Sequence, residues 1–255
     1  MSHKVPKINI FNVPFSNMTM QDTKQYLIEQ IEAGNQQHVI TANPIMVMSA
    51  MKNDAMMKVM HQANLIVADG AGVIWASQQA KAPIVERVAG IELMHELLSA
   101  GEKRHWKVYL LGTDEATISS AAEILQLRYP QIRIVGFRDG FFTAEQDKQV
   151  IEDINKLQPD LLFVARGAHN QEPWIAQHRH SLNAKLIMGV GGSFDVISGK
   201  LNRAPKWMQK AKLEWLFRLV QEPKRLPRMM DIPKFMVKVY KNKSQLTKPN
   251  VKKWK

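Results

Sequence analysis

Residues 65–72 read Leu-Ile-Val-Ala-Asp-Gly-Ala-Gly, four apolar residues followed at once by an acid and two glycines. The apolar run has the length of a buried strand. Glycine allows a sharp turn and a close approach of the backbone to a ligand, and the apolar residues 73–76 then favour a helix. This stretch therefore predicts a strand that turns directly into a helix, as in α/β folds that bind a ligand at such turns.

The same alternation of strand-like and helix-like segments extends from residue 38 to residue 192. Strands are expected at 38–41, 65–68, 108–111, 132–136, 161–165 and 186–190. Helices are expected at 20–33, 44–61, 90–100, 115–129, 144–157 and 172–181. The alternation predicts an α/β, Rossmann-like fold with a mostly parallel sheet flanked by helices. Residues 7–15 are expected to form a separate strand pair.

Polar or small residues follow these runs, and in an open α/β sheet ligands bind beyond the carboxyl ends of the strands. Thr41 and Asn43 end one run, Asp69 follows the next, and Gly191 and Gly192 follow the last. We expect them to meet in one crevice. Asp69 has two interpretations, a cap of the following helix or a general base that activates a hydroxyl.

The glycine-rich stretch 189–194, Gly-Val-Gly-Gly-Ser-Phe, lacks the final glycine of a dinucleotide-binding turn and comes late in the chain. A nicotinamide dehydrogenase is therefore disfavoured. The turn still offers backbone N–H groups to a nucleotide diphosphate. No Asp-x-Asp pair occurs, and the histidines have no metal-ligand spacing, so we expect no metal. Arginines such as Arg203 and Arg218 are then expected to neutralise the phosphates.

Positive charge is concentrated at the C-terminal end. The chain has 255 residues and a net charge of +12, and residues 200–255 hold 17 Lys and Arg against three acids. Large apolar residues, Trp207 and Trp215 among them, are interleaved with these charges, which is unlike a disordered tail. We expect an α/β core at 1–199 and a basic, helical, amphipathic appendage at 200–255 that docks on an anionic membrane surface. Nucleic acid, or an ordinary packed or solvated C-terminus, remains an alternative.

Ordered sequence blocks between about residues 8 and 240 carry a family resemblance. They are 41–43 (TAN), 68–70 (ADG), 86–90 (ERVAG), 136–142 (GFRDGFF), 171–172 (QE), 189–195 (GVGGSFD), 203–205 (RAP), 213–219 (LEWLFRL) and 222–225 (EPKR). Each block alone is weak, but the ordered set resembles the WecG/TagA/CpsF glycosyltransferases. The stretch from 191 to 219 carries the most specific part of the resemblance.

The resemblance implies an inverting glycosyltransferase that needs neither a metal nor another cofactor. Its donor would be a UDP-sugar of the N-acetylmannosamine type, either N-acetylmannosamine or its uronic acid. Its acceptor would be polyprenyl-diphosphate-linked N-acetylglucosamine, used in cell-surface polysaccharide biosynthesis. The enzyme would be cytoplasmic, associated peripherally with the inner face of the cell membrane, and is compatible with a homo-oligomer. The absence of cysteine fits that compartment.

Site residues follow from the resemblance position by position. Asp69 would be the catalytic base, Thr41 and Asn43 would position the sugar or the acceptor, and Arg87 would contact phosphate or orient the base. The substrate-binding residues would be Phe141, which stacks on uracil, Asp195, which accepts from its imide N–H, Gln171, Gly191, Gly192, Arg203, and the diphosphate-facing Arg218, Arg225 and Arg228.

One segment departs from the family pattern. His169-Asn170 stands where the family has Pro-Lys, and Arg166 replaces an apolar residue. We interpret Arg166 as a candidate substitute for the missing lysine. Two further functions remain alternatives: a nucleic-acid-binding protein that uses the basic segment, and a nucleotide-sugar transferase with a soluble acceptor.

Overall fold

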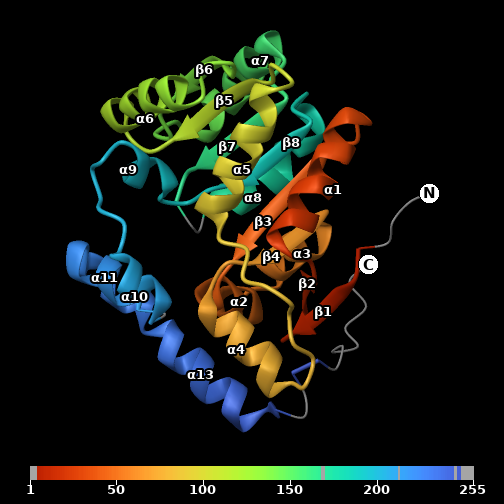
Figure 1. Cartoon of the computed structure of the whole chain (residues 1–255), viewed down its shortest axis with the longest axis vertical. Coiled ribbons are helices and arrows are strands. Elements are labelled where there is room, and N and C mark those ends of the chain that lie inside the picture. Colours follow the sequence, from red (N-terminus) through yellow and green to blue (C-terminus); the bar gives the residue numbers. More distant parts are fainter. Residues whose placement is uncertain (1–4, 168–169, 212, 244–245, 248–255) are drawn as a thin grey trace.

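The computed structural model describes residues 5–167, 170–211, 213–243 and 246–247. Its centre is a six-stranded sheet with the strand order β4-β3-β8-β7-β5-β6, in which all neighbouring strands are parallel (Figure 1). The strands are β3 (Gln37–Ala42), β4 (Leu65–Ala68), β5 (Lys107–Gly112), β6 (Arg133–Arg138), β7 (Leu161–Ala165) and β8 (Leu186–Gly189). The predicted Rossmann-like α/β class and its six strands are confirmed.

The expected strand pair near the N-terminal end is also present. Strands β1 (Lys7–Ile10) and β2 (Val13–Ser16) pair antiparallel, with Ile10 opposite Val13. Phe11 and Asn12 form the turn, and both have positive φ angles, 49° and 68°. Phe15 of β2 is fully buried, so the small sheet contributes to the core instead of standing apart.

Helices cover both faces of the large sheet. One face carries α1 (Met20–Glu32), α5 (Gly90–Glu102) and α6 (Glu115–Arg128), and the other carries α2 (Pro44–Lys52), α3 (Asp54–Gln62), α7 (Asp147–Leu157) and α8 (Gln171–His178). Alternate strand residues belong to opposite faces: Val39 packs with the first set and Ile40 with the second. Burial on both faces explains why the strands read as continuous apolar runs.

The helix expected at 44–61 is two helices, and Asn53 is the reason. Its backbone is extended, with φ −135° and ψ 110°, and its side-chain oxygen accepts from the N–H groups of Ala55 and Met56. This side chain ends α2 and caps α3. The other helices and 3-10 turns before residue 200 are α4 (Ala71–Gln79), η1 (Ala144–Gln146), η2 (Arg179–Ser181) and α9 (Ser193–Ile197).

The C-terminal helices run along one side of the molecule (Figure 1). They are α10 (Lys206–Lys210), α11 (Glu214–Gln221), η3 (Pro223–Arg225), α12 (Leu226–Met229) and α13 (Asp231–Lys241). Helix α13 packs against α2 and α4, with Phe235 and Val239 fully buried in the core. Lys52 pairs with Asp231 at 2.8 Å, and Phe235 meets the ring of Phe11 edge-on. A division into two parts after residue 199 stays a prediction.

Within the described residues, no helix combines the length and the apolar character that crossing a bilayer requires.

Phe235 tests how firmly α13 belongs to the core. Phe235→Ala should lower the free energy of unfolding by about 3–5 kcal/mol, because a fully buried ring would leave a cavity where α13 packs against α2 and α4. Val237→Ala on the same helix is the control, since Val237 is 54% exposed and should change stability by less than about 0.5 kcal/mol. Urea unfolding measures both, and equal losses would contradict the packing described.

Candidate functional site

The carboxyl ends of three adjacent strands form the centre of the candidate site. β3 leads into Asn43, β4 into Asp69, and β8 into Gly191. Thr41 in β3 donates a hydrogen bond to the carbonyl of Gly189 in β8 over 3.3 Å, which ties two of these ends together. The strand order places these residues at the same edge of the sheet, as expected, whereas their meeting in one crevice and their roles remain predictions.

Asp69 is not the cap of the following helix. Gly70 occupies the N-cap position of α4, and that helix has no side-chain cap, so the capping interpretation is wrong. A Cβ on Gly70 would lie 2.5 Å from Cδ of Pro44, which shows how closely the two turns pack. Asn43 is the residue that does cap, with its side-chain oxygen accepting from the N–H groups of Ile45 and Met46.

The Asp69 carboxyl group lies in a mixed electrostatic environment. Its side chain is 32% exposed, yet the protein atoms packed around it raise its pKa by desolvation. Arg87 and Arg218 oppose this and lower the pKa, as does the backbone N–H of Gly90 at the start of α5. Glu214 raises it further. A carboxyl group whose pKa is raised is a stronger base once it is deprotonated.

Arg87 connects Asp69 to the C-terminal helices. Its Nε donates to the Asp69 carbonyl oxygen over 2.6 Å, and its Nη2 lies 3.7 Å from Asp69 Oδ1. The same Nη2 donates to Glu214 Oε2, at the first residue of α11, over 3.1 Å. Arg203 lies near Glu214 as well, with 4.0 Å between Nε and Oε1, and pairs with Glu92 of α5.

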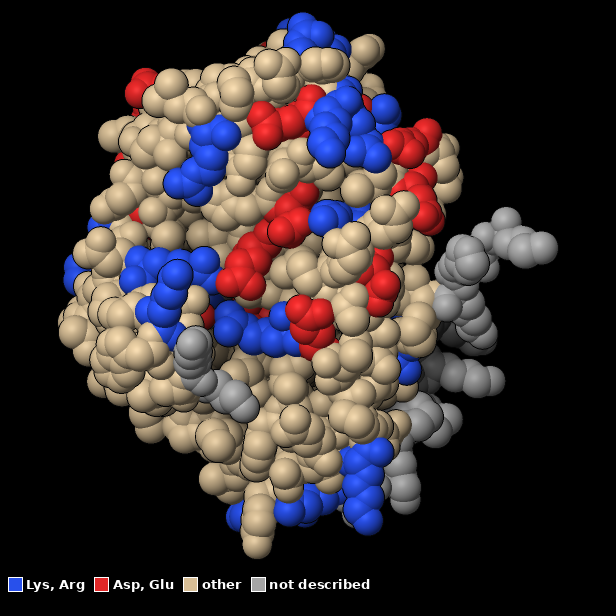
Figure 2. Space-filling view, viewed as in Figure 1, with Lys and Arg blue, Asp and Glu red and all other residues tan. Residues whose placement is uncertain are grey.

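Glu214 is one of the residues that the sequence prediction missed. It lies within the LEWLFRL block and is one of only three acids among the 56 residues from 200 to 255. An acid in so basic a segment is a signal that could have identified it. Basic and acidic side chains gather across the middle of the face shown in Figure 2, between the sheet and the C-terminal helices.

Two arginines of the C-terminal helices, Arg218 and Arg225, lie at the glycine turn, and Arg228 lies near Arg225. A Cβ on Gly192 would lie 3.8 Å from Arg218 Nη1 and 4.0 Å from Arg225 Nη2. Arg225 pairs with Glu222 at 2.9 Å. Arg228 has a buried Nε without a hydrogen-bond partner, and desolvation, then the neighbouring Arg225, lowers its pKa.

This arrangement has more positive charge than its carboxylates neutralise. Among the described residues, no carboxylate lies within ion-pair distance of Arg218 or Arg228. A buried guanidinium nitrogen without a partner costs about 1–3 kcal/mol. An anion bound at the glycine turn would offset that cost, and guanidinium groups bind phosphate through paired hydrogen bonds.

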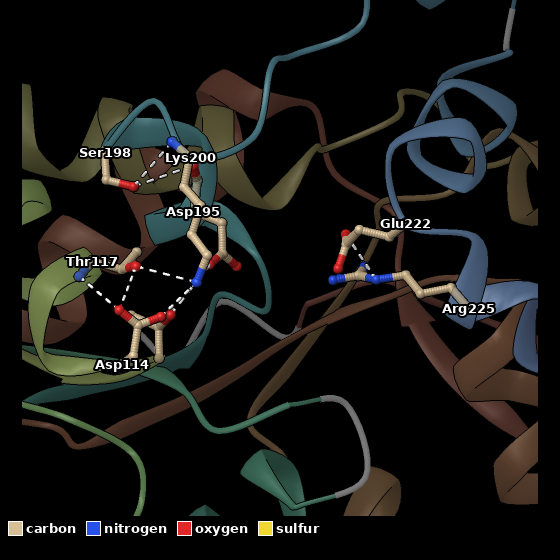
Figure 3. Close-up of polar contacts among 8 residues, drawn as sticks. Asp114, Thr117, Asp195, Ser198, Lys200, Glu222 and Arg225 are labelled. Carbon is tan, nitrogen blue, oxygen red and sulfur yellow. Dashed lines mark hydrogen bonds and ion pairs between the residues drawn. The ribbon is translucent and has the colours of Figure 1, made fainter.

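Asp195 lies on the opposite side of the same turn. Its Oδ1 accepts from the Thr113 hydroxyl over 3.2 Å and lies 3.8 Å from the Lys200 ammonium. Lys200 pairs with Asp114 and holds the pKa of that carboxyl group well below its usual range. Figure 3 shows the Asp195 and Lys200 cluster on one side and Arg225 with Glu222 on the other. Thr113 and Lys200 were not predicted as site residues.

Gln171 is buried, and its side chain holds the glycine turn at Gly191 through a hydrogen bond. Only 4% of its surface is exposed, and its Oε1 accepts from the backbone N–H of Gly191 over 3.2 Å. Gly191 has a φ of +53°, a conformation that favours glycine. A substrate on the surface of the turn would therefore meet the backbone of Gly191 and Gly192 sooner than the Gln171 side chain.

Phe141 lies apart, in the loop after β6. It is 81% exposed, and no aromatic ring in the described part of the chain stacks on it. Arg166 fastens this loop: its Nε and Nη2 donate to the carbonyls of Gly140 and Phe142 over 3.2 and 3.0 Å. The Arg166 guanidinium carbon also lies 3.7 Å from the centroid of the Phe142 ring. These contacts occupy the side chain that we interpreted as a lysine substitute. His169 lies outside the described residues.

A family comparison decides the class of this protein. The sequence profile of the "Glycosyl transferase WecG/TagA/CpsF family" matches residues 8–249. The chain belongs to this family. It is therefore a glycosyltransferase, and the resemblance seen in the ordered blocks is confirmed. In the described part of the chain, no three His, Asp or Glu residues are grouped as metal ligands.

Curated relatives match over nearly the whole chain. A protein of Staphylococcus aureus strain MW2, named N-acetylglucosaminyldiphosphoundecaprenol N-acetyl-beta-D-mannosaminyltransferase, is 37% identical over 246 residues, 95% of each chain. A protein of the same name from strain MRSA252 is 38% identical over the same coverage. The match includes both the sheet and the C-terminal helices.

The environment of Asp69 predicts opposite pH shifts in two variants. Arg87→Gln removes a cation that lowers the pKa of Asp69, whereas Glu214→Gln removes a carboxylate that raises it. If Asp69 is the general base, only its deprotonated form accepts a proton, and the acid limb of the kcat/KM profile should follow this pKa. The limb should move to higher pH in Arg87→Gln and to lower pH in Glu214→Gln.

The measurement is the midpoint of the acid limb, not the rate at its plateau, because both variants will also lose rate. In the unaltered enzyme the midpoint should lie above 3.8, the ordinary value for Asp. Three superimposable acid limbs would contradict the role of these neighbours.

Proposed function

We propose that this protein transfers an N-acetylmannosamine-type sugar from a UDP donor to polyprenyl-diphosphate-linked N-acetylglucosamine. The observation that carries the proposal is the match over 95% of both chains to relatives whose name states that acceptor and that sugar. The product would enter cell-surface polysaccharide biosynthesis. The site supports this reading because it combines one carboxyl group of raised pKa, that of Asp69, with arginines that its carboxylates do not all neutralise.

Asp69 is the proposed general base. It would take the proton from the acceptor hydroxyl while that oxygen attacks the anomeric carbon of the donor. A single displacement inverts the anomeric centre and needs only one carboxylate, unlike the carboxylate pairs of glycoside hydrolases. Arg87, bonded to the carbonyl of Asp69 and to Glu214, would keep the base oriented.

The leaving group of this reaction is a nucleoside diphosphate, which gains negative charge as the sugar departs. Arg218, Arg225 and Arg228 would stabilise that charge, since two of them reach the glycine turn and the third has an unpaired nitrogen. Asp195 would accept from the imide N–H of uracil, and the exposed ring of Phe141 would stack on the base.

A membrane surface would supply the lipid-linked acceptor. Nine of the fourteen exposed large apolar side chains in the described part of the protein lie in the C-terminal segment 207–240. They are Trp207, Trp215, Leu216, Val220, Leu226, Met230, Met236, Val237 and Tyr240. Lys234, Lys238 and Lys241 border the apolar groove along α13. Apolar groups beside lysines suit an anionic membrane, here the inner face of the cell membrane.

Asp69→Asn tests the proposed chemistry. It keeps the shape of the side chain but removes the base, so transfer should fall by at least about 10²-fold. UDP affinity, measured by calorimetry, should stay within about threefold, since the proposed UDP contacts lie at the glycine turn and on the arginines. The transfer assay uses UDP-N-acetylmannosamine and lipid-diphosphate N-acetylglucosamine, with product mass as readout. Unchanged turnover would exclude Asp69 as the base.

The exposed apolar residues predict a vesicle-binding phenotype. Replacing Trp207, Val220 and Tyr240 together by Ser should weaken binding to anionic vesicles by tenfold or more, because each side chain inserted contributes about 1.5–3 kcal/mol. Leu127→Ser is the matched control, since Leu127 is 83% exposed but lies on α6. Flotation with anionic vesicles measures both, and equal flotation of the triple variant and the control would refute this membrane-binding surface.

A further inference from the structure

A buried hydrogen-bond chain leads from β3 to the glycine turn of the site. His38 Nε2 lies 3.1 Å from Glu172 Oε2. The other carboxylate oxygen, Oε1, accepts from Gln171 Nε2 over 2.9 Å. Gln171 in turn accepts from the backbone N–H of Gly191. The side chains of His38 and Glu172 are fully buried, so neither touches a substrate.

The hydrogen bonds assign the protons of this chain. Gln171 must donate through Nε2 to Glu172, which leaves its Oε1 to accept from Gly191. His38 Nδ1 is buried without a partner, so a proton there would be an unsatisfied donor. The proton of a neutral imidazole therefore belongs on Nε2, where it is donated to the Glu172 carboxylate.

This arrangement is costly for the fold. A fully buried carboxylate loses its hydration, and here its hydrogen-bond donors are one amide and one imidazole. Its position in the first turn of α8 offsets part of that cost through the helix dipole. An apolar pair of similar size would fill the same space without the cost. We therefore ask which part of the backbone these hydrogen bonds hold that apolar packing would not.

The glycines at the end of β8 and in the turn after it show which backbone the hydrogen-bond chain holds. A Cβ on Gly189 would lie 2.6 Å from Gln171 Nε2 and closer still to Glu172 Oε1, so β8 passes directly over both side chains. Two residues later, Gly191 turns with a φ of +53° and gives its N–H to Gln171. Gly192 then faces Arg218 and Arg225. The buried chain thus sets the backbone on which the arginines converge.

We propose that His38, Glu172 and Gln171 are positioning residues, a buried relay that fixes the left-handed glycine turn where the nucleoside diphosphate is held. The identity of that ligand rests on the proposed function. If the relay were purely structural, breaking it would lower stability alone. If it positions the turn, breaking it also weakens diphosphate affinity and raises the KM for the donor, and leaves the KM for the acceptor unaltered.

Four variants of the full-length chain separate these two roles. Glu172→Leu and His38→Leu break the relay, and His38→Gln keeps a donor that can reach Glu172. His178→Leu is the matched control, because it removes another contact between a His and a carboxylate from the same helix, 3.2 Å from Asp147. Melting temperature, UDP affinity by calorimetry, and kcat with both KM values are measured for each.

The two relay-breaking variants should weaken UDP binding and raise the donor KM by about 10- to 100-fold, because a displacement of about 1 Å in such a site costs up to that much. His38→Gln should restore most of the affinity. The control should lose melting temperature without losing affinity for UDP. Gly189→Ala gives a second route, since its methyl group would displace Gln171 and Glu172 while keeping both side chains.

Two results would overturn the relay. The first is folded relay variants that bind UDP as well as the unaltered protein. The second is a loss of affinity in the His178→Leu control that equals theirs. Failure of the proposed function looks different: the unaltered protein would bind UDP but transfer no N-acetylmannosamine-type sugar, and calorimetry would still test the relay. An unaltered protein that does not bind UDP refutes the ligand assigned to the turn.

Discussion

The common direction of the six strands is the constraint on which the rest of the structure depends. Because every neighbouring pair is parallel, the polar turns after β3, β4 and β8 emerge at the same edge of the sheet. Asp69, Asn43 and the glycine turn are brought together by topology, although they are far apart in sequence. Dense burial of both sheet faces keeps these turns in place.

The C-terminal helices add charged side chains to the site at the edge of the sheet. Helix α13 is anchored by Phe235 in the core, while α11 carries Glu214 to Arg87 and Arg218 to the glycine turn. One segment therefore has a buried side that holds it, a cationic side that faces the site, and an apolar side that faces solvent. The excess positive charge of residues 200–255 is thus divided between arginines at the site and lysines on the outer surface of the C-terminal helices.

Much of the fold follows from sequence because the strands are buried on both faces and separated by recognisable helices. The break at Asn53 could not be read from apolar periodicity, since it depends on one amide that caps the next helix. The site was predicted less completely. Ordered blocks indicated Asp69 and the arginines, but Glu214, Lys200 and His38 act through partners distant in sequence. Arg166 shows the converse, since it departs from the family pattern in the sequence but its side chain holds a loop in the fold.

The central claim is that one carboxylate and a set of arginines carry out a single displacement. The configuration of the new glycosidic bond, determined by NMR on the product formed from UDP-N-acetylmannosamine and lipid-diphosphate N-acetylglucosamine, tests it most directly. A linkage of configuration opposite to that of the donor is the predicted result. A linkage that retains the donor configuration would exclude a single displacement from the face opposite the leaving group, and would contradict the account.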